Sequence, residues 1–490
     1  MADKLHVQKN EKRMTIFDPI LLILLGLTAA SLFLALPTAR RPIFWLVLLT
    51  ILLFGLPRAG GVVKAINLPL PISSLLAAGI TLQWFFLRRG LGHPQRMVDL
   101  LVLAYAMISG LGLALGLGTG GNYLIAGVEI CLYLFSIGLF FYARDNFVQP
   151  RDFRVFIKLL LALSVMISLY GIAQYFFGGG LLINYVSYNS ATDLARTYVD
   201  HDNRVRRVLS SYGDPNVLAA QLMVFIGMAG ALLFGSGHNL RIRLLAGLIL
   251  AANLLCTVLT GSRAGLFGLI IIGLTLAIWR SRWCLLLLGV ALIAGIYFLP
   301  GMLATEISQE TNNLIAADDI RHQFPTLAVQ LIQAAPLGCG FGNTLQPQFS
   351  GNTWTFEVTP AVNIWHGFNS FWLNLLSRLG VLGVLAFLAI ITLTFREVWR
   401  QNRQVQDPKV RSVIIGALAG FLAQWAIWLV NNTYMLPGGN LNFWFTLGML
   451  VAGVRAYSAQ AFPVLVSLPG QPPVGIRTVA SGLGLGPACR

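Results

Sequence analysis

The amino-acid sequence predicts an all-α membrane protein, a polytopic bundle of 12 or 13 transmembrane helices. Two observations support this class. Of 490 residues, 56% are hydrophobic and only 11% are charged, whereas soluble proteins carry about 25% charged residues. Apolar runs of about 20 residues, the length that crosses a bilayer, recur along most of the chain. No strand of note is expected between them.

The predicted spans follow in order. They lie near 17–36, 68–87, 98–118, 122–142, 154–177, 215–235, 242–260, 263–279, 283–300, 368–395, 411–431 and 441–457, and a shorter run, 43–57, is ambiguous. We expect one integral membrane domain, 1–457, in which the first span is retained, and a disordered cytoplasmic tail, 458–490, rich in Pro and Gly.

The charge pattern predicts the orientation. The 34 Lys and Arg residues exceed the 18 Asp and Glu residues, which gives a formal net charge of +16. The Lys and Arg residues gather in alternate connections, as the positive-inside rule requires of cytoplasmic loops. A nucleic-acid partner is therefore not expected. The long loops 178–214 and 301–367 then lie on the side of the membrane opposite to the cytoplasm. Thirteen spans would place the basic N-terminus outside, whereas a non-spanning 43–57 segment, which we favour, places it inside.

The loop 301–367 is expected to be the working part of the molecule, because long loops in compact proteins are usually functional or disordered. It contains a predicted helix from Asp318 to Ala335 and a glycine-rich turn, Leu337 to Gly342. This composition indicates an ordered loop that carries short helices.

The first candidate site closes the loop 178–214. Arg206 and Arg207 lie just before a predicted helix whose N-cap is Asp214 or Asn216. One interpretation is contact with lipid headgroups. The other is an anion site in which arginines and the N–H groups of a helix N-terminus act together.

The second candidate is Arg263, within the segment Thr260-Gly-Ser-Arg-Ala-Gly265 at the outer mouth of a span. It could be an interfacial arginine that reaches toward water. Alternatively, its planar fork could hold phosphate oxygens in a bidentate manner.

The third candidate is the junction between the loop and the next span. His366 and Asn369 are three residues apart and would share a face of a helix. Farther into the span, Arg378 would be costly unless it meets a partner, and Glu129 is the candidate. A histidine beside a tryptophan is more often structural than catalytic.

No metal site is predicted. Asp200-His-Asp202 matches the Asp-x-Asp pattern of metal-dependent sugar transferases, but so short a pattern arises easily by chance. The five cysteines are scattered, with no ligand or disulfide spacing, and no cofactor motif is present.

Over residues 154–450 the chain resembles the O-antigen ligase and O-antigen polymerase superfamily. The resemblance is carried by Tyr170-Gly-Ile-Ala-Gln174, Arg207 with Ser-Tyr-Gly-Asp-Pro-Asn-Val-Leu-Ala-Ala220, Thr260-Gly-Ser-Arg-Ala-Gly265, Arg321, Ala335-Pro-Leu-Gly-Cys-Gly-Phe-Gly-Asn343, and Asn369-Ser with Leu-Gly380 and Gly383.

The resemblance implies a twelve-span glycosyltransferase that works without a metal. It would transfer or polymerise a glycan from undecaprenyl pyrophosphate onto a hydroxyl of a lipid or glycan acceptor at the periplasmic face. Arg207, Arg263 and Arg321 would bind the pyrophosphate. From the candidate sites described above, we also expect Arg206, Asn216 and Arg378 to support this site. A histidine at the loop–helix junction would activate the acceptor.

The sequence departs from the family at that junction. Asn369-Ser370 stands where His-Asn is usual, and Arg378 stands where an acid is common. His366, one turn earlier, could take the role of the histidine. A cyanobacterial branch labelled as bicarbonate transporters has similar loop patterns, so anion transport is the alternative function. A transporter would be expected to hold polar groups at mid-membrane and broken helices.

Overall fold

The computed structural model describes much of the predicted membrane domain. The described residues are 42–55, 60–63, 68–71, 79–81, 97–177, 207–212, 214–235, 237–279, 282–286, 289, 293, 324–350, 353–361, 368, 370–432 and 439–461. The predictions for the first span, for most of 283–300 and for the tail from 462 onward lie outside this part of the chain.

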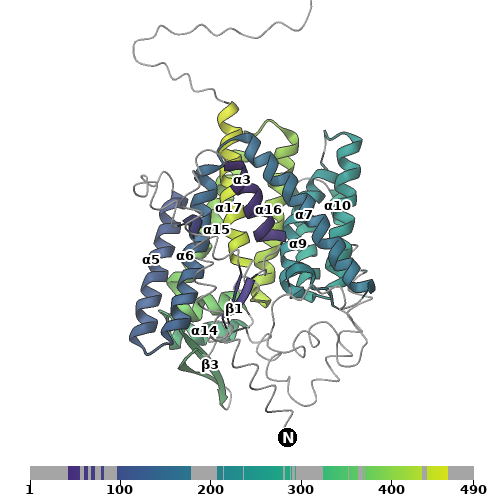
Figure 1. Cartoon of the computed structure of the whole chain (residues 1–490). Helices are drawn as coiled ribbons and strands as arrows, with labels where there is room; N and C mark the ends of the chain where they lie inside the picture. Colours follow the sequence, from purple (N-terminus) through teal and green to yellow (C-terminus); the bar gives the residue numbers. More distant parts are fainter. Residues whose placement is uncertain are drawn as a thin grey trace, which may run out of the picture.

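The described chain is mostly helical (Figure 1). Seven of its helices are long and apolar enough to cross a membrane: α5 (Met97–Gly118), α6 (Tyr123–Asn146), α7 (Pro150–Phe177), α9 (Pro215–Leu233), α10 (Leu240–Leu259), α15 (Phe371–Asn402) and α16 (Pro408–Val430). The shorter apolar helix α11 (Arg263–Trp279) and the helix α17 (Gly439–Ala461) join the same bundle. The described residues thus contain helices that are suited to span a membrane, whereas the total of 12 or 13 remains a prediction.

Two small antiparallel hairpins correct the expectation of a chain without strands. β1 (Gly60–Val63) pairs with β2 (Leu68–Pro71), and β3 (Asn343–Ser350) pairs with β4 (Thr353–Pro360). The predicted span 68–87 therefore begins as a strand rather than as a helix. The ambiguous run 43–57 is helical over α3 (Pro42–Thr50) and the π-helical turn η2 (Ile51–Gly55).

Short polar side chains set where the long helices begin. The Asn122 side chain accepts from the backbone N–H of Leu124 at 3.1 Å at the start of α6. Asp214 and Asp407 cap α9 and α16 in the same way, each followed by a proline at the first helical position. Such caps satisfy donors that a helix leaves unpaired, and proline loses nothing there because it has no N–H.

The centre of the bundle is formed by α9, which is buried along most of its length against α10, α11 and α16. Glycines allow the closest approach: a Cβ added to Gly227 of α9 would lie 2.1 Å from the carbonyl oxygen of Gly416 in α16. Because lipid offers no hydrophobic drive between helices, such small-residue contacts supply the packing.

The helices alternate in direction, so the bundle has two ends (Figure 1). We call the end with the connections 147–149, 234–239 and 403–407 the basic end. The loop end holds the turn 119–121, the turn 260–262, the short helix α14 (Phe324–Ala334) and the β3–β4 hairpin. Among the described Lys and Arg residues, only Arg207 and Arg263 lie at the loop end, and Arg378 lies inside α15. This is the charge asymmetry that the sequence predicted.

Candidate functional site

The two loop-end arginines lie where three helix termini meet: the start of α9, the end of α10 and the start of α11. We name the group Arg207, Asn216, Thr260, Ser262 and Arg263 the arginine corner. The segment before α9 is tied to the end of α10 by a backbone hydrogen bond from Val208 N to Leu259 O at 3.2 Å. Two motifs 50 residues apart in the sequence thus form one site.

Asn216 connects the members of the arginine corner. Its Oδ1 accepts from Arg207 Nη2 at 3.3 Å and from Ser262 Oγ at 2.8 Å. Arg207 Nε also donates to the carbonyl oxygen of Thr260 at 3.0 Å. Arg207 is half-buried, and Thr260 and Ser262 are buried. Both of these acceptors, an amide oxygen and a backbone carbonyl oxygen, are neutral.

The N-cap of α9 is Asp214, one of the two residues expected there. Its Oδ1 accepts from the N–H of Asn216 at 2.8 Å and of Val217 at 3.0 Å. Two of the backbone donors that the anion-site hypothesis required are thus already occupied. Any anion at the corner would be bound by the arginine side chains more than by the N-terminus of α9.

Arg263 is the first residue of α11 and is half-buried. The turn before it is rigid: Ser262 Oγ accepts from Gly265 N at 3.2 Å, and Gly261 has a φ of 59°. A Cβ on Gly265 would lie 2.8 Å from the Cβ of Ala219 in α9. Small residues therefore bring the starts of α9 and α11 together.

A second layer fixes the segment 207–212. The Gln174 side chain of α7 accepts from Ser210 N at 2.8 Å, and Ser210, which has a φ of 48°, donates through Oγ to Ile167 O at 2.7 Å. A Cβ on Gly171 would lie 2.7 Å from a methyl carbon of Val208. The motif Tyr170 to Gln174 is thereby explained as a support for the corner, a role that its apolar context concealed.

The glycine-rich turn after α14 forms a second unit, which we name the glycine clamp and define as residues 336–343. It packs into α5: Phe341 N donates to Gly112 O at 3.1 Å, and a Cβ on Gly116 would lie 1.9 Å from Phe341 O. The Asn343 side chain donates to Thr119 Oγ1 at 2.7 Å. Only glycine backbone fits between the clamp and α5.

The glycine clamp also supplies hydrogen-bond partners to backbone groups at a break in α15. Gly380 has a φ of 63° and interrupts the helix. The carbonyl oxygen of Ser377 accepts from Cys339 N at 2.7 Å, and that of Arg378 accepts from Gly340 N at 3.1 Å. Val381 N donates to Pro336 O at 2.9 Å. Backbone groups that a helix break would leave unpaired in a membrane are thus satisfied by protein.

Arg378 meets Glu129, the partner proposed for it. Arg378 Nη2 and Nε lie 3.0 and 3.2 Å from Glu129 Oε1, and both side chains are almost wholly buried. Arg378 Nη1 donates to Asn343 O, and Gly342 N donates to Glu129 Oε2 at 2.9 Å. The pair therefore fastens α6, α15 and the clamp together. Its guanidinium is occupied by protein acceptors, which indicates a structural role rather than direct contact with substrate.

Four of the predicted site residues, Arg206, Arg321, His366 and Asn369, lie outside the described residues, as do Asp200 and Asp202. The shared helix face predicted for His366 and Asn369 is therefore untested. α15 begins at Phe371, with Ser370 as its N-cap. The Asn374 side chain accepts from Phe368 N at 2.9 Å and so fixes the chain at the entrance to α15.

Sequence reasoning missed Ser262, Gln174 and Ser210. Each is a small or neutral polar residue whose role depends on a distant partner, and the only available signal was its position beside a predicted arginine or glycine. Within the described chain, no three His, Cys, Asp or Glu side chains gather as a metal site would require.

Comparison with known proteins leaves the family open. No protein-family model matches the chain, and no curated protein matches it. The resemblance to the O-antigen ligase and polymerase superfamily therefore depends on the order and spacing of the motifs.

Proposed function

We propose that the protein is a membrane glycosyltransferase of O-antigen ligase or polymerase type, active at the periplasmic face of the bacterial inner membrane. The observation that carries the proposal is the arginine corner. Arg207 and Arg263 stand against the charge bias of the bundle, and Arg207 is linked through Asn216 to Ser262, the residue before Arg263. Such an arrangement suits a polyanionic group at the membrane surface.

The proposed substrate is a glycan linked to a polyprenyl pyrophosphate. The oxygen of an acceptor hydroxyl forms a bond with the anomeric carbon, and the bond from that carbon to the pyrophosphate oxygen breaks. The electron pair leaves with the pyrophosphate, whose growing charge is stabilised by positioned arginines. The acceptor's proton passes to a base, for which His366 is the candidate, while Asn369 orients the hydroxyl. Arg321 would complete the cationic site.

In this mechanism, stabilisation of the leaving pyrophosphate depends mainly on how the arginine side chains are oriented. A guanidinium presents a planar fork to two phosphate oxygens, whereas lysine presents a single point charge. Arg207 is fixed by Thr260 and Asn216 through Nε and Nη2, so its guanidinium is held in one orientation. Fixed donors lower the barrier because they need no reorganisation during the reaction.

The test is transfer from a purified polyprenyl-pyrophosphate glycan in proteoliposomes. Arg207→Lys and Arg263→Lys should each lower kcat/KM by about tenfold or more, because a charge-assisted hydrogen bond is worth about 1.5–3 kcal/mol. Arg403→Lys, at the basic end, is the matched control and should keep full activity. His366→Ala should abolish transfer, and Asn369→Ala should reduce it less. Full activity in both Arg207→Lys and Arg263→Lys would contradict the proposal and indicate that these arginines contact lipid headgroups instead of substrate.

Anion transport remains the second candidate, because α15 is broken at Gly380 beside the intramembrane Arg378. Broken helices and buried charges are typical of transporters. Arg378 already donates to Glu129 and to the carbonyl oxygen of Asn343. These contacts argue against Arg378 as a ligand for bicarbonate. Uptake of labelled bicarbonate by the same proteoliposomes, without glycan transfer, would favour transport. Gene deletion should alter surface polysaccharide under the transferase proposal and inorganic carbon uptake under the transport alternative.

A further inference from the structure

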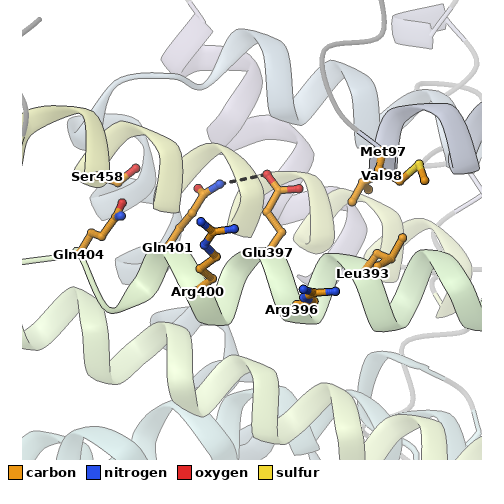
Figure 2. A pocket seen from close by; sticks show the side chains of 9 residues that line it. All are labelled: Met97, Val98, Leu393, Arg396, Glu397, Arg400, Gln401, Gln404 and Ser458. Carbon is orange, nitrogen blue, oxygen red and sulfur yellow. Dashed lines mark hydrogen bonds between the residues drawn. The ribbon is translucent and has the colours of Figure 1, made fainter.

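A pocket of about 460 Å³ opens at the basic end of the bundle, opposite the arginine corner. Figure 2 shows the side chains that line it. It lies between the start of α5, the last turns of α15 and the end of α17. The lining residues are Met97, Val98, Leu393, Arg396, Glu397, Arg400, Gln401, Gln404 and Ser458. One wall is thus apolar, and the others are basic and polar.

The positive charge in this pocket is not balanced by its lining. Arg396 and Arg400 are four residues apart on α15, so they lie one helical turn from each other. Glu397 is the only acid among the lining residues. It is engaged by Arg455 Nη2 at 3.5 Å and accepts from Gln401 Nε2 at 3.1 Å (Figure 2). Like charges at this spacing are mutually destabilising, and a bound anion would remove the cost.

The apolar wall of the pocket favours an anion that also carries an apolar part. Met97 is 65% exposed, and Leu393 lies beside it in the lining. A small soluble anion would leave this wall unused, whereas a lipid would place its acyl chains along it and its phosphate near the arginines. Gln401, Gln404 and Ser458 offer donors and acceptors to the hydroxyls of a headgroup.

We infer that this pocket binds the phosphate group of an anionic membrane phospholipid. Basic pockets between transmembrane helices at the positively charged side recognise such headgroups. The site is separate from the arginine corner and does not depend on the proposed glycosyl transfer. Bound lipid would join α5, α15 and α17, and so stabilise the end of the bundle where these helices separate.

The experiment measures thermal unfolding of the delipidated full-length protein in detergent. Added phosphatidylglycerol should raise Tm, and phosphatidylcholine with the same acyl chains should not. In Arg396→Gln/Arg400→Gln the apparent phosphatidylglycerol affinity should fall about tenfold or more, the scale of one or two lost charge-assisted contacts. Arg403→Gln/Lys409→Gln removes the same charge from exposed positions at the same end and should bind as the wild type does.

A second pair of variants keeps the test decisive if the glutamine pair does not fold. Arg396→Lys/Arg400→Lys retains the charge and should bind phosphatidylglycerol more weakly than the wild type does, because the bidentate fork is lost. If the Arg403/Lys409 control loses as much phosphatidylglycerol affinity as the pocket variants do, the effect comes from surface charge and the proposed site is wrong. Equal stabilisation by phosphatidylcholine, or by inorganic phosphate at the same concentration, would overturn the assignment of an anionic lipid.

Discussion

Asn216 is the residue on which the geometry of the arginine corner depends, because a single side-chain oxygen accepts from both Arg207 and Ser262. A helix that begins with Asp214-Pro215-Asn216 is predictable from capping rules. The second role of Asn216, which joins α9 to the turn before α11, is not predictable, because it requires knowledge of which helix starts lie side by side.

We expect graded losses when this junction is weakened. Ser262→Ala removes the hydrogen bond to Asn216, worth about 1 kcal/mol, and also the one that Ser262 Oγ accepts from Gly265 N, and should lower kcat/KM for glycan transfer by about fivefold or more. Asn216→Ala removes both contacts, lets the Arg207 guanidinium move, and should cost more than Ser262→Ala does. The measurement is steady-state transfer kinetics in proteoliposomes. An Asn216→Ala enzyme with unchanged kinetics would show that Arg207 is oriented by Thr260 alone.

Cys339 provides a chemical probe of the glycine clamp. Burial raises the pKa of its thiol, and the nearby Arg378 guanidinium offsets this only in part. In a variant with Cys339 as its sole cysteine, alkylation at pH 8 should be at least about tenfold slower than alkylation of Gln404→Cys, an exposed site, in a cysteine-free protein. Rapid alkylation of the intact protein would mean that the clamp opens readily.

The same shift predicts how stability depends on pH. The pKa of the Cys339 thiol is higher in the folded protein than in the unfolded chain, where it is about 8.5. The contribution of this thiol to the free energy of unfolding is therefore fully present below about pH 8.5 and falls as the pH rises above that value. Thermal unfolding measured between pH 7 and pH 10 should therefore show a steeper decline for the wild type than for Cys339→Ala. Parallel declines would assign the alkaline sensitivity to other groups.

At the scale of elements, the pair Glu129–Arg378 holds α6, α15 and the clamp together. Removal of one partner leaves an unpaired buried charge and should cost about 3–5 kcal/mol. Glu129→Gln and Arg378→Met should therefore each lower Tm strongly, and the double variant should be more stable than the sum of the two losses predicts.

The readout for this cycle is thermal unfolding in detergent, with glycan transfer measured in parallel. If Arg378 acts structurally, the double variant should recover activity together with stability. A stable double variant that cannot transfer glycan would assign Arg378 a role at the substrate.

The long helices could be predicted from the sequence because apolar length is a local property. Within the described residues, the helices α5, α6, α7, α9, α10, α11, α15, α16 and α17 lie close to the expected runs. The hairpins could not. β3 contains Asn343, Thr344 and Gln346 between apolar residues, a pattern with none of the apolar length by which spans were recognised. The site was foreseen as three separate motifs. Its assembly could not be foreseen, because the partners of Arg207 and Arg378 are 9 to 249 residues distant.

For the whole molecule, the unequal ends predict the orientation in the membrane. The described Lys and Arg residues lie mainly at the basic end, which the positive-inside rule assigns to the cytoplasm. In a cysteine-free background, Ser350→Cys at the tip of the β3–β4 hairpin should react with an impermeant maleimide in intact spheroplasts. Gln404→Cys should react only after lysis. The reverse pattern would place the arginine corner in the cytoplasm and remove the proposed reaction with it.

The break at Gly380 has a consequence for how the protein is made. An unbroken apolar helix can enter the bilayer alone, but α15 carries two carbonyl groups whose partners are Cys339 and Gly340. These residues leave the ribosome before α15 does, and the helices that seat them, α5 and α6, leave earlier still. We therefore expect α15 to insert against a surface that is already assembled. The parts of the chain that α15 needs as hydrogen-bond partners are therefore synthesised before α15 itself.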